Sequence, residues 1–146
     1  LEEECITLSE LIHSFSQEDL KKFECIIVDE AQFATEEQID YLSDLVDNMN
    51  IPVMCYGLRC DFQNHFFEGS RRLMEIADSI EEVKTVCWCG KKAICNMRYN
   101  EDGVAVKEGE QITQGQMIGK SSTSNISKEL ENHLPGDVDY EIIYTS

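Results

Sequence analysis

The sequence predicts an α/β fold in which a parallel sheet is followed by a small β-hairpin domain. Two continuous apolar segments, residues 24–28 and 50–58, are typical of strands buried on both faces of a parallel sheet. The segment between them carries apolar residues at helical spacing, and the order strand, helix, strand predicts a right-handed parallel crossover. Beyond residue 82 the apolar residues alternate around a turn at residues 100–103, which predicts an antiparallel hairpin.

The helices on either side of the first strand are predicted from their caps. Thr7 and Glu10 have the spacing of a capping box and apolar residues follow on one side, so we expect residues 5–23 to be helical. Thr35 and Gln38 form a second such pair and predict the start of the helix between the two strands. Both helices should therefore begin at a hydrogen-bonded side chain.

A further helix is predicted after the second strand. Pro52 stands near the start of that strand, where a missing N–H group is tolerated. The helix is expected to begin near Gly69 and Ser70. Its inward-facing residues are predicted to be Leu73, Met74, Ile76 and Ala77.

We expect a domain boundary near residue 82. Residues 1–82 are predicted to be the carboxyl-terminal part of an α/β domain, and residues 83–146 to be a small second domain. Gly, Ser, Asn and Gln are frequent from about residue 109 onward, which predicts a flexible segment there.

Composition disfavours several classes of partner. The 146 residues include 29 acidic and 12 basic side chains, and the resulting net charge of -17 disfavours binding to nucleic acid. No apolar run approaches the roughly 20 residues that span a bilayer, so no membrane partner is expected. The seven cysteines are odd in number and no secretory cue is present, which favours a reducing, cytoplasmic location.

Asp29 and Glu30 directly follow the first predicted strand, in the stretch CIIVDEAQF. Ligands of parallel α/β sheets bind beyond the carboxyl ends of the strands, so both carboxylates and the segment after Leu58 are expected on one rim. Three interpretations compete at this point. The pair could bind magnesium and water in an ATPase or helicase, it could include the base of a small-molecule kinase, or it could be a solvated turn.

The segment after the second strand, CYGLRCDFQNHFFEGS, combines aromatic and polar residues. Phe62 and Phe67 flank polar side chains, an arrangement that suits stacking of a planar base while polar groups bind its edge. The alternative is that these phenylalanines belong to the core of the following helix.

Cys87 and Cys89 stand close together near a turn. Two thiolates at this spacing can supply half of a tetrahedral zinc site, which needs two further ligands. Cys95 is too far along the predicted hairpin to be an evident third ligand, and His133 is isolated. The alternative is a pair of ordinary thiols.

In this order and spacing, these segments resemble the thymidine kinases of the cytosolic type (type II), and most of all their bacterial branch. A phenylalanine-rich segment followed by a cysteine pair is not expected in a helicase, so the resemblance favours a kinase. It covers residues 24 to about 115. The matching segments are VDEAQF, IPVMCYGLRCDFQ, FFEGS, VKTVCWCGKKA and EGEQI.

The resemblance implies a portion of a P-loop-type nucleotide kinase followed by a small zinc-bearing lasso domain. The implied reaction transfers the γ-phosphate of ATP to the 5′-hydroxyl of thymidine, which gives dTMP for nucleotide salvage and DNA synthesis. By the matching motif, Glu30 is the catalytic base and Asp29 assists Mg²⁺ through water. Ala31 and Gln32 are implied to lie in the same ATP-binding stretch.

The same resemblance implies the nucleoside and metal contacts. The residues that match thymidine-binding positions are Leu58, Phe62, Phe67, Gly115 and Tyr144, the last of them across a polar insertion over residues 116–143. Cys87 and Cys89 match structural zinc ligands, and the remaining ligands are expected beyond Ser146. The family is often tetrameric, so a homo-oligomer is expected.

The chain departs from this family in one respect that bears on activity. The Gly-rich phosphate-binding loop that ends in Gly-Lys-Ser/Thr does not occur in the sequence. We therefore expect the chain to be an incomplete portion of a kinase and to be inactive alone. Two other functions stay open here: a P-loop ATPase or helicase piece, and a non-enzymatic, zinc-stabilised interaction module with a basic partner.

Overall fold

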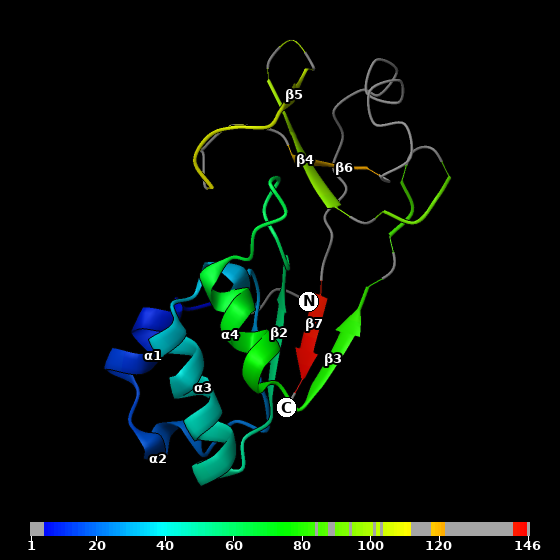
Figure 1. Ribbon diagram of the computed structural model, residues 1–146. Helices are drawn as coiled ribbons and strands as arrows, with labels where there is room; N and C mark the ends of the chain where they lie inside the picture. The colour runs from blue at the N-terminus through cyan, green and yellow to red at the C-terminus, as the bar shows by residue number, and fades with distance from the viewer. Residues whose placement is uncertain are drawn as a thin grey trace. The chain divides into compact units, whose positions relative to one another are not determined.

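The computed structural model of the chain forms two compact units (Figure 1). It describes residues 5–83, 85–87, 90–93, 95–100, 102 and 104–111, and the backbone of residues 118–121 and 142–145. The first unit consists of Leu1–Gly57, Glu68–Glu81 and Ile143–Ser146. The second unit consists of Leu58–Phe67 and Glu82–Ile142.

The first unit is built on a four-stranded sheet with the strand order β1-β2-β7-β3. Its strands are β1 (Ile26–Val28), β2 (Val53–Gly57), β7 (Ile142–Thr145) and β3 (Ser79–Glu82). β1 and β2 pair in parallel, with Ile26 beside Val53 and Val28 beside Cys55. The predicted parallel sheet is therefore confirmed. The sequence does not predict β3, because its four residues are all exposed and mostly polar.

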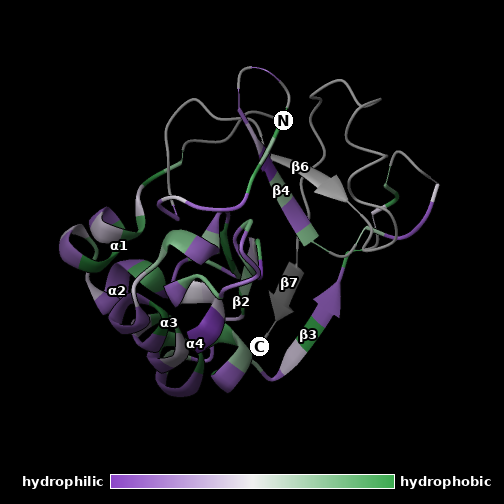
Figure 2. Cartoon of the chain, turned by 45° about the horizontal axis from the view of Figure 1, so that its top comes forward, coloured by the Kyte–Doolittle hydropathy of each residue, from purple (hydrophilic) through white to green (hydrophobic). Residues whose placement is uncertain are grey.

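Helices in the described part of the first unit pack against this sheet and against one another. They are α1 (Leu8–Ser14), α2 (Gln17–Leu20), the short 3₁₀ helix η1 (Ala31–Phe33), α3 (Glu36–Met49) and α4 (Glu68–Ile76). α3 and α4 lie on the same face of the sheet (Figure 1). Figure 2 shows polar and apolar residues interspersed along both helices. The buried apolar residues are Ile39, Leu42 and Leu45 of α3 and Leu73 of α4. No helix among the described residues combines the length and apolar character that crossing a bilayer requires.

The two predicted capping boxes are confirmed. The backbone N–H of Glu10 donates to the Thr7 hydroxyl at 3.2 Å, and the backbone N–H of Gln38 donates to the Thr35 hydroxyl at 3.2 Å. Each of these caps satisfies a backbone donor that the first turn of a helix leaves without an intrahelical partner.

The predicted single helix over residues 5–23 is wrong, because the chain forms two short helices there. Phe15 has an extended backbone, which ends α1. Ser16 then begins α2 with a capping box of its own, in which the backbone N–H of Asp19 donates to the Ser16 hydroxyl at 3.2 Å. The serine hydroxyl thus offers the backbone an alternative to continuing the first helix.

The two parallel strands differ in burial. In β2 the residues Val53, Cys55 and Gly57 are buried, and the residues between them are half-buried. β1 lies at the edge of the described sheet, and its central residue Ile27 is 67% exposed. The prediction that both faces of the first strand are buried is therefore wrong, because α3 and α4 cover only one face.

Most of the predicted inward face of α4 is correct. Ser70 and Leu73 are buried, and Ile76 and Ala77 are half-buried. Met74 is 37% exposed, so its predicted inward position is wrong. Its side chain follows Leu73 by one position, which turns it about 100° around the helix, away from the buried face.

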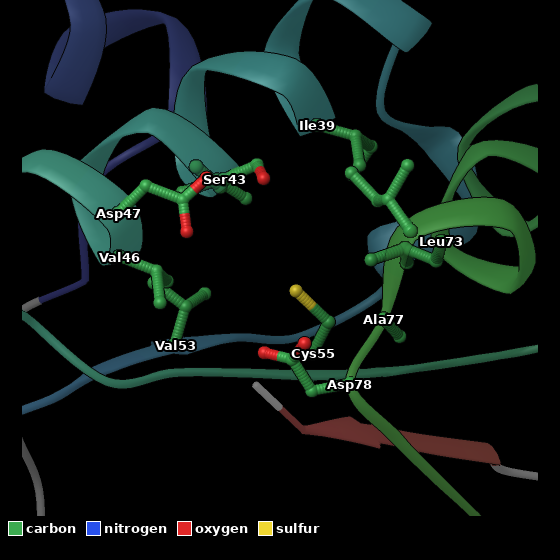
Figure 3. Close-up of a pocket in the computed structure, with 11 residues that line it drawn as sticks. Ile39, Ser43, Val46, Asp47, Val53, Cys55, Leu73, Ala77 and Asp78 are labelled. Atoms are coloured by element: carbon green, nitrogen blue, oxygen red, sulfur yellow. The ribbon is translucent and has the colours of Figure 1, made fainter.

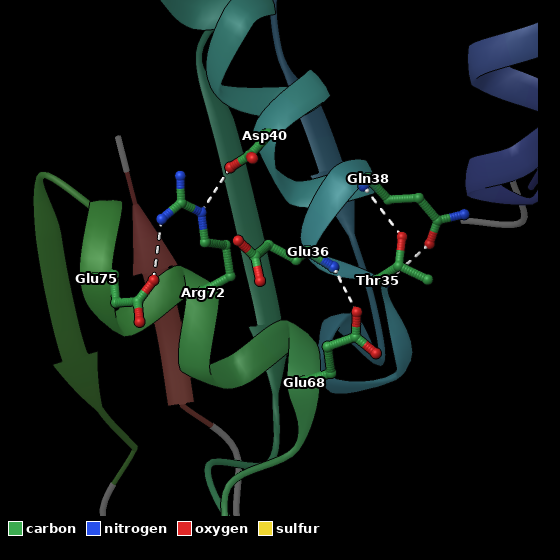
Figure 4. Close-up of polar contacts among 7 residues, drawn as sticks. All are labelled: Thr35, Glu36, Gln38, Asp40, Glu68, Arg72 and Glu75. Carbon is green, nitrogen blue, oxygen red and sulfur yellow. Dashed lines mark hydrogen bonds and ion pairs between the residues drawn. The ribbon is translucent and has the colours of Figure 1, made fainter.

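Polar contacts join α4 to the start of α3 (Figure 4). The Arg72 guanidinium donates to the Asp40 carboxylate at 2.6 Å and to the Glu75 carboxylate at 3.0 Å. The Glu68 carboxylate accepts from the backbone N–H of Glu36 at 2.9 Å. Charge pairs of this exposed kind contribute little stability each, so they orient the two helices more than they hold them.

The second unit contains a three-stranded antiparallel sheet with the order β5-β4-β6. Its strands are β4 (Cys95–Tyr99), β5 (Ala105–Val106) and β6 (Ile118–Ser121). β4 and β5 form the predicted hairpin, in which the backbone N–H of Asn100 donates to the carbonyl oxygen of Val104 at 2.9 Å. β6 pairs with the other edge of β4, in a polar segment for which the sequence predicts no strand.

The two units do not coincide with the predicted segments 1–82 and 83–146. Residues 58–67 belong to the second unit because their side chains and backbone bond to β4 and to residues 107–111. The last residues belong to the first unit because β7 adds to its sheet. Such contacts between distant segments give no local signal in the sequence.

Two glycines allow η1 to pack closely against β2 and α4. A Cβ atom at Gly57 of β2 would lie 2.5 Å from the side-chain oxygen of Gln32. A Cβ atom at Gly69 of α4 would lie 2.8 Å from the carbonyl oxygen of Ala34 and closer still to that of Ala31. Cβ atoms essentially never approach other atoms within 3.0 Å. At Gly69 the atoms in the way are backbone oxygens, so only glycine permits this packing there, whereas at Gly57 the Gln32 side chain could shift.

We predict that Gly69→Ala destabilises the protein by about 1 to 3 kcal/mol, because the added methyl group meets backbone carbonyls that cannot rotate away. Urea unfolding of the full-length protein measures this change. Arg71→Ala, at an exposed position of the same helix, is the matched control and should change stability by less than about 0.5 kcal/mol. Equal midpoints for Gly69→Ala and wild type would contradict the packing described here.

Candidate active site

Asp29 and Glu30 form a turn between β1 and η1. The Asp29 carboxylate accepts from the backbone N–H of Glu30 at 2.9 Å, and the Glu30 carboxylate accepts from the side-chain amide of Gln32. Both carboxylates are exposed, whereas Gln32 is buried. Exposed carboxylates at the end of a strand can hold a hydrated cation or accept a proton from a substrate.

The backbone of Glu30 is in the left-handed region, with φ 53° and ψ 35°. This conformation costs about 1 to 2 kcal/mol for a residue other than glycine. Such conformations persist where the surrounding structure enforces them, and they concentrate at functional sites. Glu30 directly precedes η1, which packs closely against Gly57 and Gly69.

The predicted ATP-binding and catalytic residues of the first unit follow one another on this turn. Asp29, Glu30, Ala31 and Gln32 lie at the carboxyl ends of β1 and β2, because η1 packs against Gly57, the last residue of β2. Ala31 is 1% exposed. The turn therefore presents the two carboxylates and buries the two residues that follow them.

In the second unit, residues 58–67 form a loop that the buried side chain of Asp61 organises. The Asp61 carboxylate accepts from the backbone N–H groups of Gln63 at 2.8 Å and His65 at 2.9 Å. The residue between them, Asn64, has a positive φ of 62°. These bonds from one carboxylate fix a tight turn, so the aromatic residues beside it have a defined backbone.

The three predicted base-binding residues of this loop differ in exposure. Phe67 is 4% exposed, whereas Leu58 and Phe62 are half-buried. The guanidinium carbon of Arg98, in β4, lies 3.9 Å from the centre of the Phe62 ring. Sequence reasoning grouped Asp61 with the polar side chains that would bind the edge of a base, and it missed that Asp61 organises the loop. It missed Arg98 altogether; the one signal is an arginine placed within a predicted strand.

Cys87 lies in a tight turn and is 3% exposed. The backbone N–H of Gly90 donates to the Cys87 carbonyl oxygen at 2.8 Å, and Gly90 has a φ of 81°. Burial is the largest cause that raises the pKa of the nearby Tyr99, and the charges of Cys87 and Cys95 raise it further. Across the described residues, no group of three or more potential metal ligands occurs. The zinc site therefore stays a prediction.

The other predicted site residues fall largely outside the described part of the chain. Cys89 and Gly115 are not among the described residues. The backbone of Tyr144 lies in β7 of the first unit. The structure therefore leaves the predicted roles of these three residues untested.

A cavity of about 140 Å³ lies in the first unit between α3, β2 and α4 (Figure 3). Most of the residues that line it are apolar, and Ser43, Asp47 and Asp78 are the polar ones. Burial raises the pKa of the Cys55 thiol in its wall to about 12, so this thiol is protonated and unreactive at neutral pH. The cavity includes none of the predicted site residues.

The sequence is similar to that of named thymidine kinases. Over 95 residues it is 57% identical to a thymidine kinase of Mannheimia succiniciproducens, covering 65% of this chain and 49% of that protein. Over 122 residues it is 45% identical to a thymidine kinase of Legionella pneumophila, which covers 75% of this chain and 58% of that protein. Over 114 residues it is 54% identical to a thymidine kinase of Enterobacteria phage T4, which covers 78% of this chain and 59% of that protein. The chain thus spans about half the length of these relatives.

Residues 1–121 match the thymidine kinase family. This match includes the turn that carries Asp29 and Glu30 (the carboxylate turn), the loop at residues 58–67 (the aromatic loop) and β4. The chain therefore belongs to the thymidine kinase family.

Proposed function

We propose that the full-length protein carrying this chain transfers the γ-phosphate of ATP to the 5′-hydroxyl of thymidine, which gives dTMP for nucleotide salvage and DNA synthesis. The family match over residues 1–121 is the observation that carries this proposal. The position of Asp29 and Glu30 at the carboxyl ends of two parallel strands supports it, because nucleotide ligands of α/β sheets bind there. No comparable observation favours an ATPase, a helicase or a zinc-stabilised interaction module.

In this proposal Glu30 is the general base. A primary hydroxyl is a weak nucleophile at neutral pH, and a positioned carboxylate accepts its proton as the new bond to phosphorus forms. The hydrogen bond from Gln32 and the fixed backbone of Glu30 orient this carboxylate. A carboxylate that is oriented in this way is already placed to accept the proton when the substrate binds.

Asp29 is the residue proposed to hold Mg²⁺ through water. When bound with ATP, the ion neutralises charge that develops on the phosphates. The Asp29 side chain fits this role because it is exposed. Among the described residues, only the backbone N–H of Glu30 donates to its carboxylate, through one oxygen. Ala31 and Gln32 are proposed to complete the ATP-binding stretch.

The thymine base is proposed to bind Leu58, Phe62 and Phe67, with further contacts from Gly115 and Tyr144. Phe62 suits stacking because it is half-buried and its ring is held from one side. Cys87 and Cys89 are proposed as two ligands of a structural zinc ion, and the tight turn that buries Cys87 supports this. We further propose a cytoplasmic homo-oligomer.

The test is phosphorylation of thymidine by the full-length protein with ATP and magnesium, with dTMP and ADP quantified separately. The proposal expects equal amounts of dTMP and ADP. Release of ADP without dTMP would overturn it in favour of an ATPase.

We predict that Glu30→Gln lowers kcat by about 10²- to 10⁴-fold, because glutamine cannot accept the proton of the hydroxyl. The KM for thymidine should change little, since the base acts mainly in the transition state. Steady-state kinetics of the full-length protein measure both constants. Glu37→Gln removes the same charge from an exposed position of α3 and should leave kcat unchanged. Normal turnover of Glu30→Gln would remove this residue from the mechanism.

We predict that Phe62→Ala raises the KM for thymidine by about 5- to 150-fold, because stacking of a base on an aromatic side chain contributes roughly 1 to 3 kcal/mol. The KM for ATP should stay the same. Phe66→Ala is the matched control, because Phe66 lies in the same loop and is 38% exposed. The stacking role fails if both variants have the wild-type KM for thymidine.

A further inference from the structure

The Arg98 side chain is buried beneath the loop at residues 58–67 and bonds to a third segment of the second unit. It is 4% exposed, and its guanidinium lies over the Phe62 ring at 3.9 Å. Its two terminal nitrogens donate to the carbonyl oxygens of Glu110 at 2.6 Å and Gln111 at 2.9 Å. One side chain therefore contacts the aromatic loop and residues 110–111 at once.

Stability alone does not account for a charge in this position. None of the ion pairs among the described residues includes Arg98, and its Nε atom is buried without a hydrogen-bond partner. A buried charge with incomplete hydrogen bonding is costly, and an apolar side chain of similar volume often supports a fold as well. The arginine is better explained by the orientation that its planar, forked group imposes.

Other hydrogen bonds join the same two segments. The Gln111 side-chain amide donates to the Asp61 carboxylate at 3.0 Å and to the carbonyl oxygen of Phe66 at 3.1 Å. The Gln63 side-chain amide donates to the carbonyl oxygen of Lys107 at 3.1 Å. The aromatic loop and residues 107–111 therefore form one hydrogen-bonded assembly, with Arg98 between them.

We propose that Arg98 is a positioning residue for the nucleoside base, which fixes the plane of the Phe62 ring and the backbone of residues 110–111. This inference rests on the proposed function, in which Phe62 stacks on thymine. The guanidinium covers one face of the ring, so only the opposite face is available to the base.

The first test compares Arg98→Met and Arg98→Lys in the full-length protein. We expect each variant to raise the KM for thymidine by about tenfold, with kcat and the KM for ATP within about threefold of wild type. Lysine should not restore the KM, because it lacks the planar fork that binds two carbonyls and stacks on a ring. Arg71→Met, at an exposed arginine of α4, should have the wild-type KM.

A double variant decides whether Arg98 acts through Phe62. If it does, Arg98→Met combined with Phe62→Ala raises the KM for thymidine by less than the product of the two single effects. A wild-type KM in a folded Arg98→Lys variant overturns the proposal, as does full multiplicativity in the double variant. Should Arg98→Met fail to fold, the KM of the lysine variant decides between the two outcomes.

Hydrogen exchange tests the positioning role without any kinase assay. Arg98→Met should accelerate amide exchange at residues 61–66 and 107–111 and leave α3 unchanged. Unchanged exchange at both segments overturns the positioning role whatever the protein phosphorylates. Conversely, a wild-type protein that leaves thymidine untouched refutes the proposed function but leaves this measurement valid.

Discussion

The candidate active site depends on the close packing of two glycines against the 3₁₀ helix η1. Gly57 ends a buried strand, Gly69 begins a helix, and both approach the 3₁₀ turn that follows β1. Glu30, which directly precedes this turn, has a left-handed backbone conformation that residues other than glycine rarely adopt. The result is a pair of exposed carboxylates on a rigid turn, which suits a base that must meet a hydroxyl in one geometry.

In the second unit, buried side chains hold the aromatic loop, residues 58–67, in place. The Asp61 carboxylate accepts hydrogen bonds from backbone N–H groups within the loop, and the Arg98 guanidinium covers one face of the Phe62 ring. Both side chains are buried and charged, which is costly for stability. In the proposed function, this loss of stability has a purpose, because the loop keeps one shape while a nucleoside binds and dissociates.

Local features of the fold could be predicted from the sequence, whereas features set by distant contacts could not. The caps at Thr7 and Thr35 and the two parallel strands follow from spacing and apolar runs. The position of Asp29 and Glu30 at the strand ends follows from the same pattern. The contacts of Arg98 depend on a segment twelve or more residues away in sequence, and β3 lacks the apolar alternation that predicts a strand. The zinc and ATP contacts rest on family resemblance.

In the proposed mechanism, the carboxylate turn and the aromatic loop act on the same nucleoside. A crystal structure of the full-length protein with thymidine and a non-hydrolysable ATP analogue tests this most directly. We expect the 5′-hydroxyl within hydrogen-bond reach of the Glu30 carboxylate, about 2.6 to 3.2 Å, and the thymine ring against the face of Phe62 opposite Arg98. A nucleoside whose 5′-hydroxyl lies beside a different side chain, or whose base is remote from Phe62, would contradict the mechanism.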